Sequence, residues 1–60
     1  MTNNDILAYL RTVGKPVYFR DIANWFPGDA EEAELFRRLR ILVETGFVRR
    51  TKSGKFEVMR

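Results

Sequence analysis

The feature of this sequence that most constrains its fold is a change of period at Gly46. Before this glycine, five apolar residues recur at the spacing of an amphipathic helix, namely Leu35, Phe36, Leu39, Leu42 and Val43. After it, "FVRRT" and "KFEVM" are rich in β-forming residues and are joined around "KSGK", a Gly-containing turn of two to four residues. Gly46 can adopt the left-handed conformation that ends a helix. We therefore expect a helix, ending at Thr45 and Gly46, that passes directly into a β-hairpin.

The beginning of this helix is marked by acidic residues. Asp29 and Glu32 have the spacing of a capping box, in which the first side chain accepts a free backbone N–H and the second reaches back to the cap. Acids are also favourable near the positive end of the helix dipole. The pattern therefore predicts that this helix starts at Asp29.

Two further helices are expected upstream. Asn3 or Asn4 can cap the first helix, which Gly14 ends. Its apolar residues have helical spacing and are Ile6, Leu7, Leu10 and Val13. "PVYF" is typical of a short extended segment and leads into a second helix over residues 19–26. The inward face of this second helix is expected to be Phe19, Ile22, Ala23 and Phe26.

Size and composition exclude several classes of function. A chain of 60 residues forms one small domain, residues 1–60. It has no cysteine and no histidine, which excludes disulfides and metal sites built on thiolates or imidazoles. Ser53 lies in a turn without a plausible base, so we expect no enzymatic activity, no cofactor and no small-molecule substrate. The sequence shows neither a membrane-spanning apolar run nor a signal peptide, which predicts a cytoplasmic protein without membrane contact.

The order of these elements, together with "FRRLRILVETGFVRR", resembles the winged helix-turn-helix family. Leu42, three spacer residues, Gly46 and Phe47 match that family's exit from the recognition helix into the wing, and the pair Ile22 and Ala23 matches its preceding helix. The resemblance covers nearly the whole chain. It implies an α+β, mainly α fold, with three helices and a C-terminal β-hairpin wing. Many members bind DNA through the recognition helix and wing, whereas others serve protein assembly.

The charge distribution agrees with an anionic partner. Eleven Lys and Arg against eight Asp and Glu give a net charge of +3, and the positive charge lies mostly in the C-terminal third. From the resemblance we expect binding of double-stranded DNA, by a dimer, in transcription regulation or as an accessory factor in DNA transactions. The candidate DNA-binding residues are Arg20, Arg37, Arg38, Arg40, Arg49, Arg50, Lys52 and Lys55.

An alternative follows from the acids around the third helix. Glu31, Glu32 and Glu34 would be repelled by phosphates unless they tilt away from the DNA. The arginines of this helix also have acids at i, i+4, in the pairs Glu34–Arg38 and Arg40–Glu44, which is typical of a solvated helix flank. The second hypothesis is therefore a protein-interaction module that contacts another protein or a second copy. Its candidate contact residues are Trp25 and the outward-facing Ile41.

Overall fold

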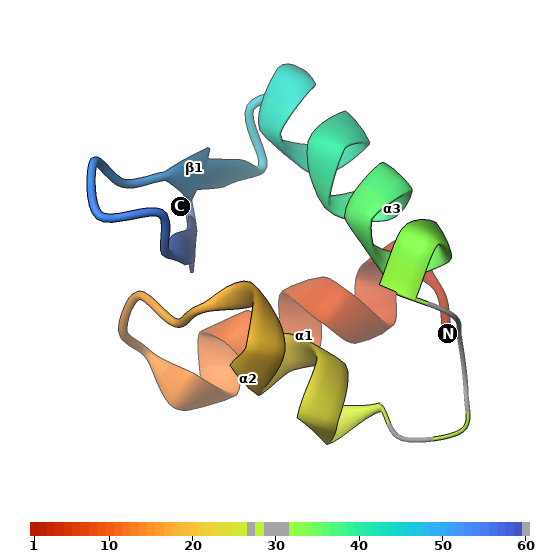
Figure 1. Cartoon of the computed structure of the whole chain (residues 1–60). Helices are drawn as coiled ribbons and strands as arrows, with labels where there is room; N and C mark the ends of the chain where they lie inside the picture. The colour runs from red at the N-terminus through yellow and green to blue at the C-terminus, as the bar shows by residue number, and fades with distance from the viewer. Residues whose placement is uncertain (27, 29–31, 60) are drawn as a thin grey trace.

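The computed structural model describes residues 1–26, 28 and 32–59, and these form three helices followed by an antiparallel hairpin (Figure 1). The elements, in chain order, are α1 (Asn3–Val13), α2 (Phe19–Trp25), α3 (Glu32–Glu44), β1 (Val48–Arg50) and β2 (Phe56–Val58). The predicted α+β, mainly helical class is confirmed at this level. The predicted cap at Asp29 lies outside the described residues.

The N-terminus of α1 is capped one residue earlier than the sequence suggested, so the prediction of Asn3 or Asn4 as the cap is wrong. The hydroxyl of Thr2 accepts a hydrogen bond from the backbone N–H of Asp5 at 3.1 Å. In return, the Asp5 carboxylate accepts one from the backbone N–H of Thr2 at 2.8 Å. This reciprocal pair is a capping box and satisfies two backbone donors at once, which a lone asparagine cap cannot do. Gly14, with φ 72°, closes the other end.

The expected extended segment before α2 forms a bridge to the hairpin. Val17 donates a backbone hydrogen bond to Phe56 at 2.9 Å and accepts one from Phe56 at 2.7 Å. The next residue, Tyr18, precedes α2, and its backbone N–H donates to the carboxylate of Asp21 at 3.0 Å. The connection between α1 and α2 is therefore held against the outer edge of β2. The helix itself ends at Trp25, one residue before the predicted end.

The turn of the hairpin is short and fixes the pairing of the two strands. Arg49 lies opposite Glu57, and Arg50 lies opposite Phe56. One further backbone hydrogen bond, from Thr51 to Lys55 at 2.8 Å, leaves a three-residue loop over 52–54. Its last residue is a glycine with φ 86°, as is common in three-residue hairpin loops. The predicted Gly-containing turn is confirmed.

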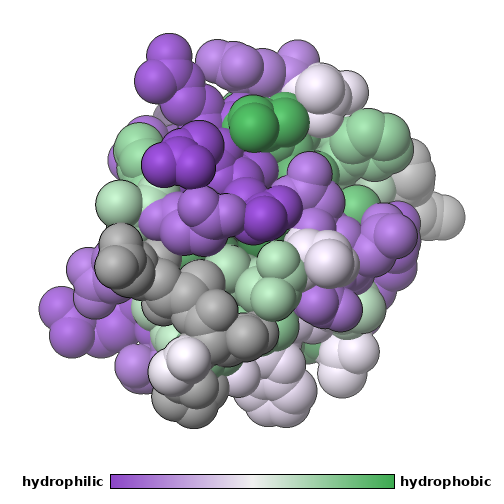
Figure 2. Space-filling view, turned by 90° about the vertical axis from the view of Figure 1, so that its right-hand side faces the viewer, coloured by the Kyte–Doolittle hydropathy of each residue, from purple (hydrophilic) through white to green (hydrophobic). Residues whose placement is uncertain are grey.

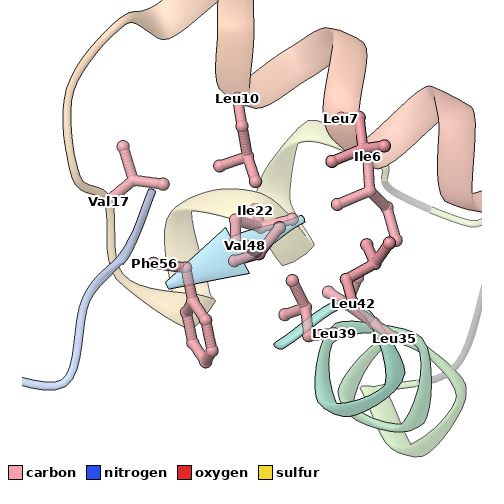
Figure 3. Close-up of a cluster of buried hydrophobic side chains, with 10 residues drawn as sticks. All are labelled: Ile6, Leu7, Leu10, Val17, Ile22, Leu35, Leu39, Leu42, Val48 and Phe56. Carbon is pink, nitrogen blue, oxygen red and sulfur yellow. The ribbon is translucent and has the colours of Figure 1, made fainter. Parts of the chain in front are cut away.

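The core brings together side chains from all three helices and the hairpin (Figure 3). The prediction that Leu35, Leu39 and Leu42 form the buried stripe of α3 is confirmed. The inclusion of Phe36 in that stripe is wrong, because 52% of this residue is exposed. At 100° per residue it lies on the flank of the helix, where its ring meets Phe19 edge-on at 6.2 Å. The buried residues are Ile6, Leu7, Leu10, Val17, Ile22, Leu35, Leu39, Leu42, Val48 and Phe56.

None of the helices described is long and apolar enough to cross a membrane.

Candidate nucleic-acid interface

Three cations near the loop of the hairpin, here called the hairpin end, are not ion-paired with any described carboxylate. They are Arg50, Lys52 and Lys55. The guanidinium of Arg50 lies 5.8 Å from the centroid of the Phe56 ring, and the ammonium of Lys55 lies 4.9 Å from that of the Tyr18 ring. Aromatic faces attract cations without neutralising them, so both charges stay available to an anion. Lys52 lies in the three-residue loop and is exposed.

Arg49 differs from its neighbours because it has a carboxylate partner within the hairpin. Its Nε donates to Oε1 of Glu57 at 2.8 Å, and the two residues are directly opposite in the strand register. Cross-strand pairs of opposite charge stabilise a hairpin modestly. Arg49 therefore supports the fold of the hairpin, and its charge is largely balanced inside the molecule.

The arginines of α3 are paired with glutamates of the same helix. Arg37 and Arg38 both bind Glu34, at 3.1 Å and 2.9 Å. Arg40 donates to Glu44 at 3.2 Å. The expected i, i+4 pairs Glu34–Arg38 and Arg40–Glu44 are thus confirmed, and Arg37 adds an i, i+3 contact that the sequence hypothesis did not include. Glu34, one of two acids in the first turn of α3, is thus neutralised by two guanidinium groups at once.

A hollow of about 350 Å³ lies between α3 and the hairpin. Its apolar floor consists of Phe36, Leu39, Val43 and Phe56. Charged side chains form the rest of its lining, with Arg40 and Glu44 from α3 and Arg50 from β1. The sequence did not indicate this hollow, because it depends on how the hairpin folds back towards the helix. It places one arginine of α3 and one arginine of the hairpin on the same concave surface.

The remaining predicted residues lie elsewhere. Arg20 is exposed in the first turn of α2. Ile41 is 44% exposed. The side of the molecule that carries α3 and the N-terminus is mainly hydrophilic with scattered hydrophobic areas (Figure 2).

Sequence reasoning missed two other exposed apolar residues, Phe47 and Met59. A backbone hydrogen bond from Met59 to Phe47 at 2.8 Å places them side by side at the open end of the hairpin.

Trp25 belongs to an aromatic group between α1 and α2. It is 60% exposed, and its ring lies 5.0 Å from that of Tyr9, which in turn meets Phe26 edge-on at 6.3 Å. Burial, and secondarily the negative charge of Asp21, raise the pKa of Tyr9 above its ordinary value of 10.0. The structure thus separates Trp25 from the basic hairpin and joins it to α1.

Comparisons with profiles of protein families, with curated proteins and with solved structures gave no match to this chain.

Proposed function

We propose that this chain is a winged helix-turn-helix module that binds double-stranded DNA, with the β1–β2 hairpin as its wing. In this role it regulates transcription or assists another DNA transaction. The observation that carries the proposal is the charge at the hairpin end, where Arg50, Lys52 and Lys55 have no carboxylate partner among the described residues. Cations of this kind bind backbone phosphates and set the position of a protein on the duplex without reading its sequence.

The geometry supports a contact surface larger than the hairpin loop. The hollow between α3 and the hairpin brings Arg40 within the same concave lining as Arg50. Among the residues that the structure describes, Arg40 is ion-paired only with Glu44, and both side chains are more than half exposed. An exposed pair of this type is worth roughly 0.2–1 kcal/mol. Arg40 can therefore become a fourth phosphate contact once Glu44 no longer holds it, beside the three hairpin cations that contact phosphates in the wild-type chain.

The test is the salt dependence of DNA binding, measured by fluorescence anisotropy with a labelled duplex of mixed sequence. Three phosphate contacts give a slope of log K against log salt of about −2.7, or about a 40-fold loss of affinity between roughly 50 and 200 mM salt. In the variant Arg50→Ala with Lys52→Ala, we expect a slope near −1 because one contact remains. The matched single changes are Lys52→Ala in the loop and Lys15→Ala, an exposed lysine after α1.

The slopes of Lys52→Ala and Lys15→Ala decide between the two outcomes. A shallower slope for Lys52→Ala than for Lys15→Ala supports phosphate contact by the hairpin. Equal slopes for all variants would show that the hairpin cations do not meet phosphates, and the proposed function would fail.

A second candidate function is favoured by the pairing on α3. Because Arg37, Arg38 and Arg40 are all bound to glutamates, α3 has no cation left over for DNA, while Ile41 stays exposed beside them. Such a surface fits a protein partner, whose contacts combine an apolar centre with charged surroundings. The test is Ile41→Glu in an affinity pull-down, with Ala33→Glu as the control on the same helix. Equal capture of partner proteins by both variants would remove this candidate.

A further inference from the structure

The exposed side of α1 carries a pattern that is symmetric about one small residue. Opposite the buried side chains of this helix, Ala8 is exposed at the centre. Asp5 lies three positions before it, and Arg11 lies three positions after it. Asn4 and Thr12 lie four positions before and after. Residues three and four apart share a helix face, so all of them surround Ala8. The described residues include no ion-pair partner for Arg11.

This pattern is complementary to itself when reversed. If a second α1 crosses the first in the opposite direction at Ala8, each Asp5 faces the Arg11 of the other copy. Likewise, each Asn4 faces the other copy's Thr12. The methyl group of Ala8 allows two helices to approach closely, because interaxial distance depends on the side chains at the crossing point. A two-fold axis requires such self-complementarity from a single surface.

An exposed aromatic group lies beside this helix face. Trp25 of α2 stacks against Tyr9 of α1 and is 60% exposed. Next to the indole is a hollow of about 270 Å³, lined by Asp5, Ala8, Tyr9, Thr12, Trp25 and Phe26. The surface thus offers a projecting ring and a recess side by side. Tryptophan and tyrosine are enriched among residues that dominate binding energy at protein interfaces.

We propose that this face of α1, together with Trp25, binds a second copy of the chain around a two-fold axis at Ala8. The partner is a second copy because the charges at the two ends of the face match each other only in reverse order. Figure 1 shows the end of α2, where Trp25 lies, at the bottom of the view and the hairpin above it. The hollow at α1 shares no residue with the hollow at the hairpin, so a dimer leaves both hairpins free.

The dimer is weak, because the face is small. A standard interface buries about 800 Å² on each partner, which is nearly a fifth of the 4350 Å² surface of this chain. One helix face and one tryptophan provide no more than that. We expect a dissociation constant on the order of 10–100 µM. Association should therefore depend on concentration in an accessible range.

The experiment is sedimentation velocity from about 10 µM to about 1 mM, with tryptophan emission recorded on the same samples. Trp25 is the only tryptophan of the chain, so its emission reports burial of this face directly. The wild-type chain should change from monomer to dimer with a blue shift of emission. Ala8→Glu should stay monomeric across the range. Its matched control, Ala33→Glu, places the same change on an exposed alanine of α3 and should dimerise as the wild type does.

A charge exchange tests the orientation of the two copies. Arg11→Glu and Asp5→Lys should each weaken self-association at least about tenfold, because like charges meet at both ends of the interface. A mixture of the two variants should form a heterodimer, in which both ends carry opposite charges. Asp5→Lys removes the hydrogen bond from the Thr2 backbone N–H to the carboxylate but keeps the one from the residue-5 backbone N–H to the Thr2 hydroxyl. Far-UV circular dichroism checks that α1 remains folded. A wild-type chain that stays monomeric at about 1 mM, or a mixture without heterodimer, would overturn the proposal.

Discussion

Glu34 is ion-paired with two arginines of α3, and its neutralisation tests where this helix lies in the proposed complex with DNA. The change Glu34→Gln removes one negative charge and releases both Arg37 and Arg38 from their carboxylate partner. If the arginine side of α3 lies against the duplex, two further cations lose their carboxylate partner and can contact phosphates, and Arg38 then exchanges its remaining hydrogen bond to Asn3 for a phosphate. We therefore expect tighter binding and a stronger dependence on salt.

The magnitude follows from the number of cations released. Three contacts by the hairpin give a slope of about −2.7, and two more steepen it to about −4.5. The loss of affinity between roughly 50 and 200 mM salt then rises from about 40-fold to about 500-fold. Glu44→Gln releases only Arg40 and should give about −3.6. Glu32→Gln changes the net charge equally, yet none of the described arginines is bound to Glu32, so its slope should match that of the wild type.

The assay is the same anisotropy titration, with the three single variants compared across salt concentrations. Loss of these two surface ion pairs, of which Arg38–Glu34 is half-buried, costs about 0.4–2 kcal/mol of stability. The total is roughly 3–9 kcal/mol for 60 residues, so Glu34→Gln stays folded, and thermal melts can confirm it. Contact by α3 is supported if the slope is steepest for Glu34→Gln, intermediate for Glu44→Gln and shallowest for Glu32→Gln. Identical slopes for Glu34→Gln and Glu32→Gln would refute it and leave the helix to a protein partner.

Two other predictions concern stability. Leu39 is fully buried, so Leu39→Ala should lower the free energy of unfolding by about 2–5 kcal/mol, whereas Ile41→Ala, at an exposed position, should change it by less than about 0.5 kcal/mol; urea unfolding compares the two. The pKa of Tyr9 is raised in the folded state, so the protonated phenol contributes to the free energy of unfolding. This contribution is complete below the ordinary pKa of 10.0 and is lost as the pH rises through the folded-state pKa. Tyr9→Phe should remove this loss, and urea midpoints from about pH 9 upward would show a smaller alkaline decline than in the wild type.

The helices and the hairpin were predictable because each depends on local pattern. The spacing of Leu35, Leu39 and Leu42 defines one buried stripe, and the change to β-forming residues after Gly46 defines the hairpin. The same local logic predicted the pairs Glu34–Arg38 and Arg40–Glu44 from their i, i+4 spacing.

The errors arose where tertiary packing or competing caps decide the outcome. Phe36 has the hydrophobicity of a core residue, but the hairpin leaves a hollow beside it instead of covering it. Thr2 displaced Asn3 and Asn4 as the cap because only Thr2 has an acid three residues later that can return the hydrogen bond. The pairing of Arg49 with Glu57 depends on strand register, which follows from the length of the loop.

The pairing of arginines with glutamates makes the salt slope a better discriminator of function than affinity itself. When a phosphate replaces Glu44 as the partner of Arg40, one ion pair is exchanged for another, and the direct energies nearly cancel. The gain comes from the counterions that DNA releases, and this gain falls as the salt concentration rises. A protein partner that covers Ile41 gains mainly from burial of apolar surface, which carries no such dependence. A slope steeper than the value of about −2.7 expected for the hairpin alone would therefore indicate contact between DNA and α3 even if binding were weak. Tight binding of a protein with a flat slope would instead favour a protein partner for this helix.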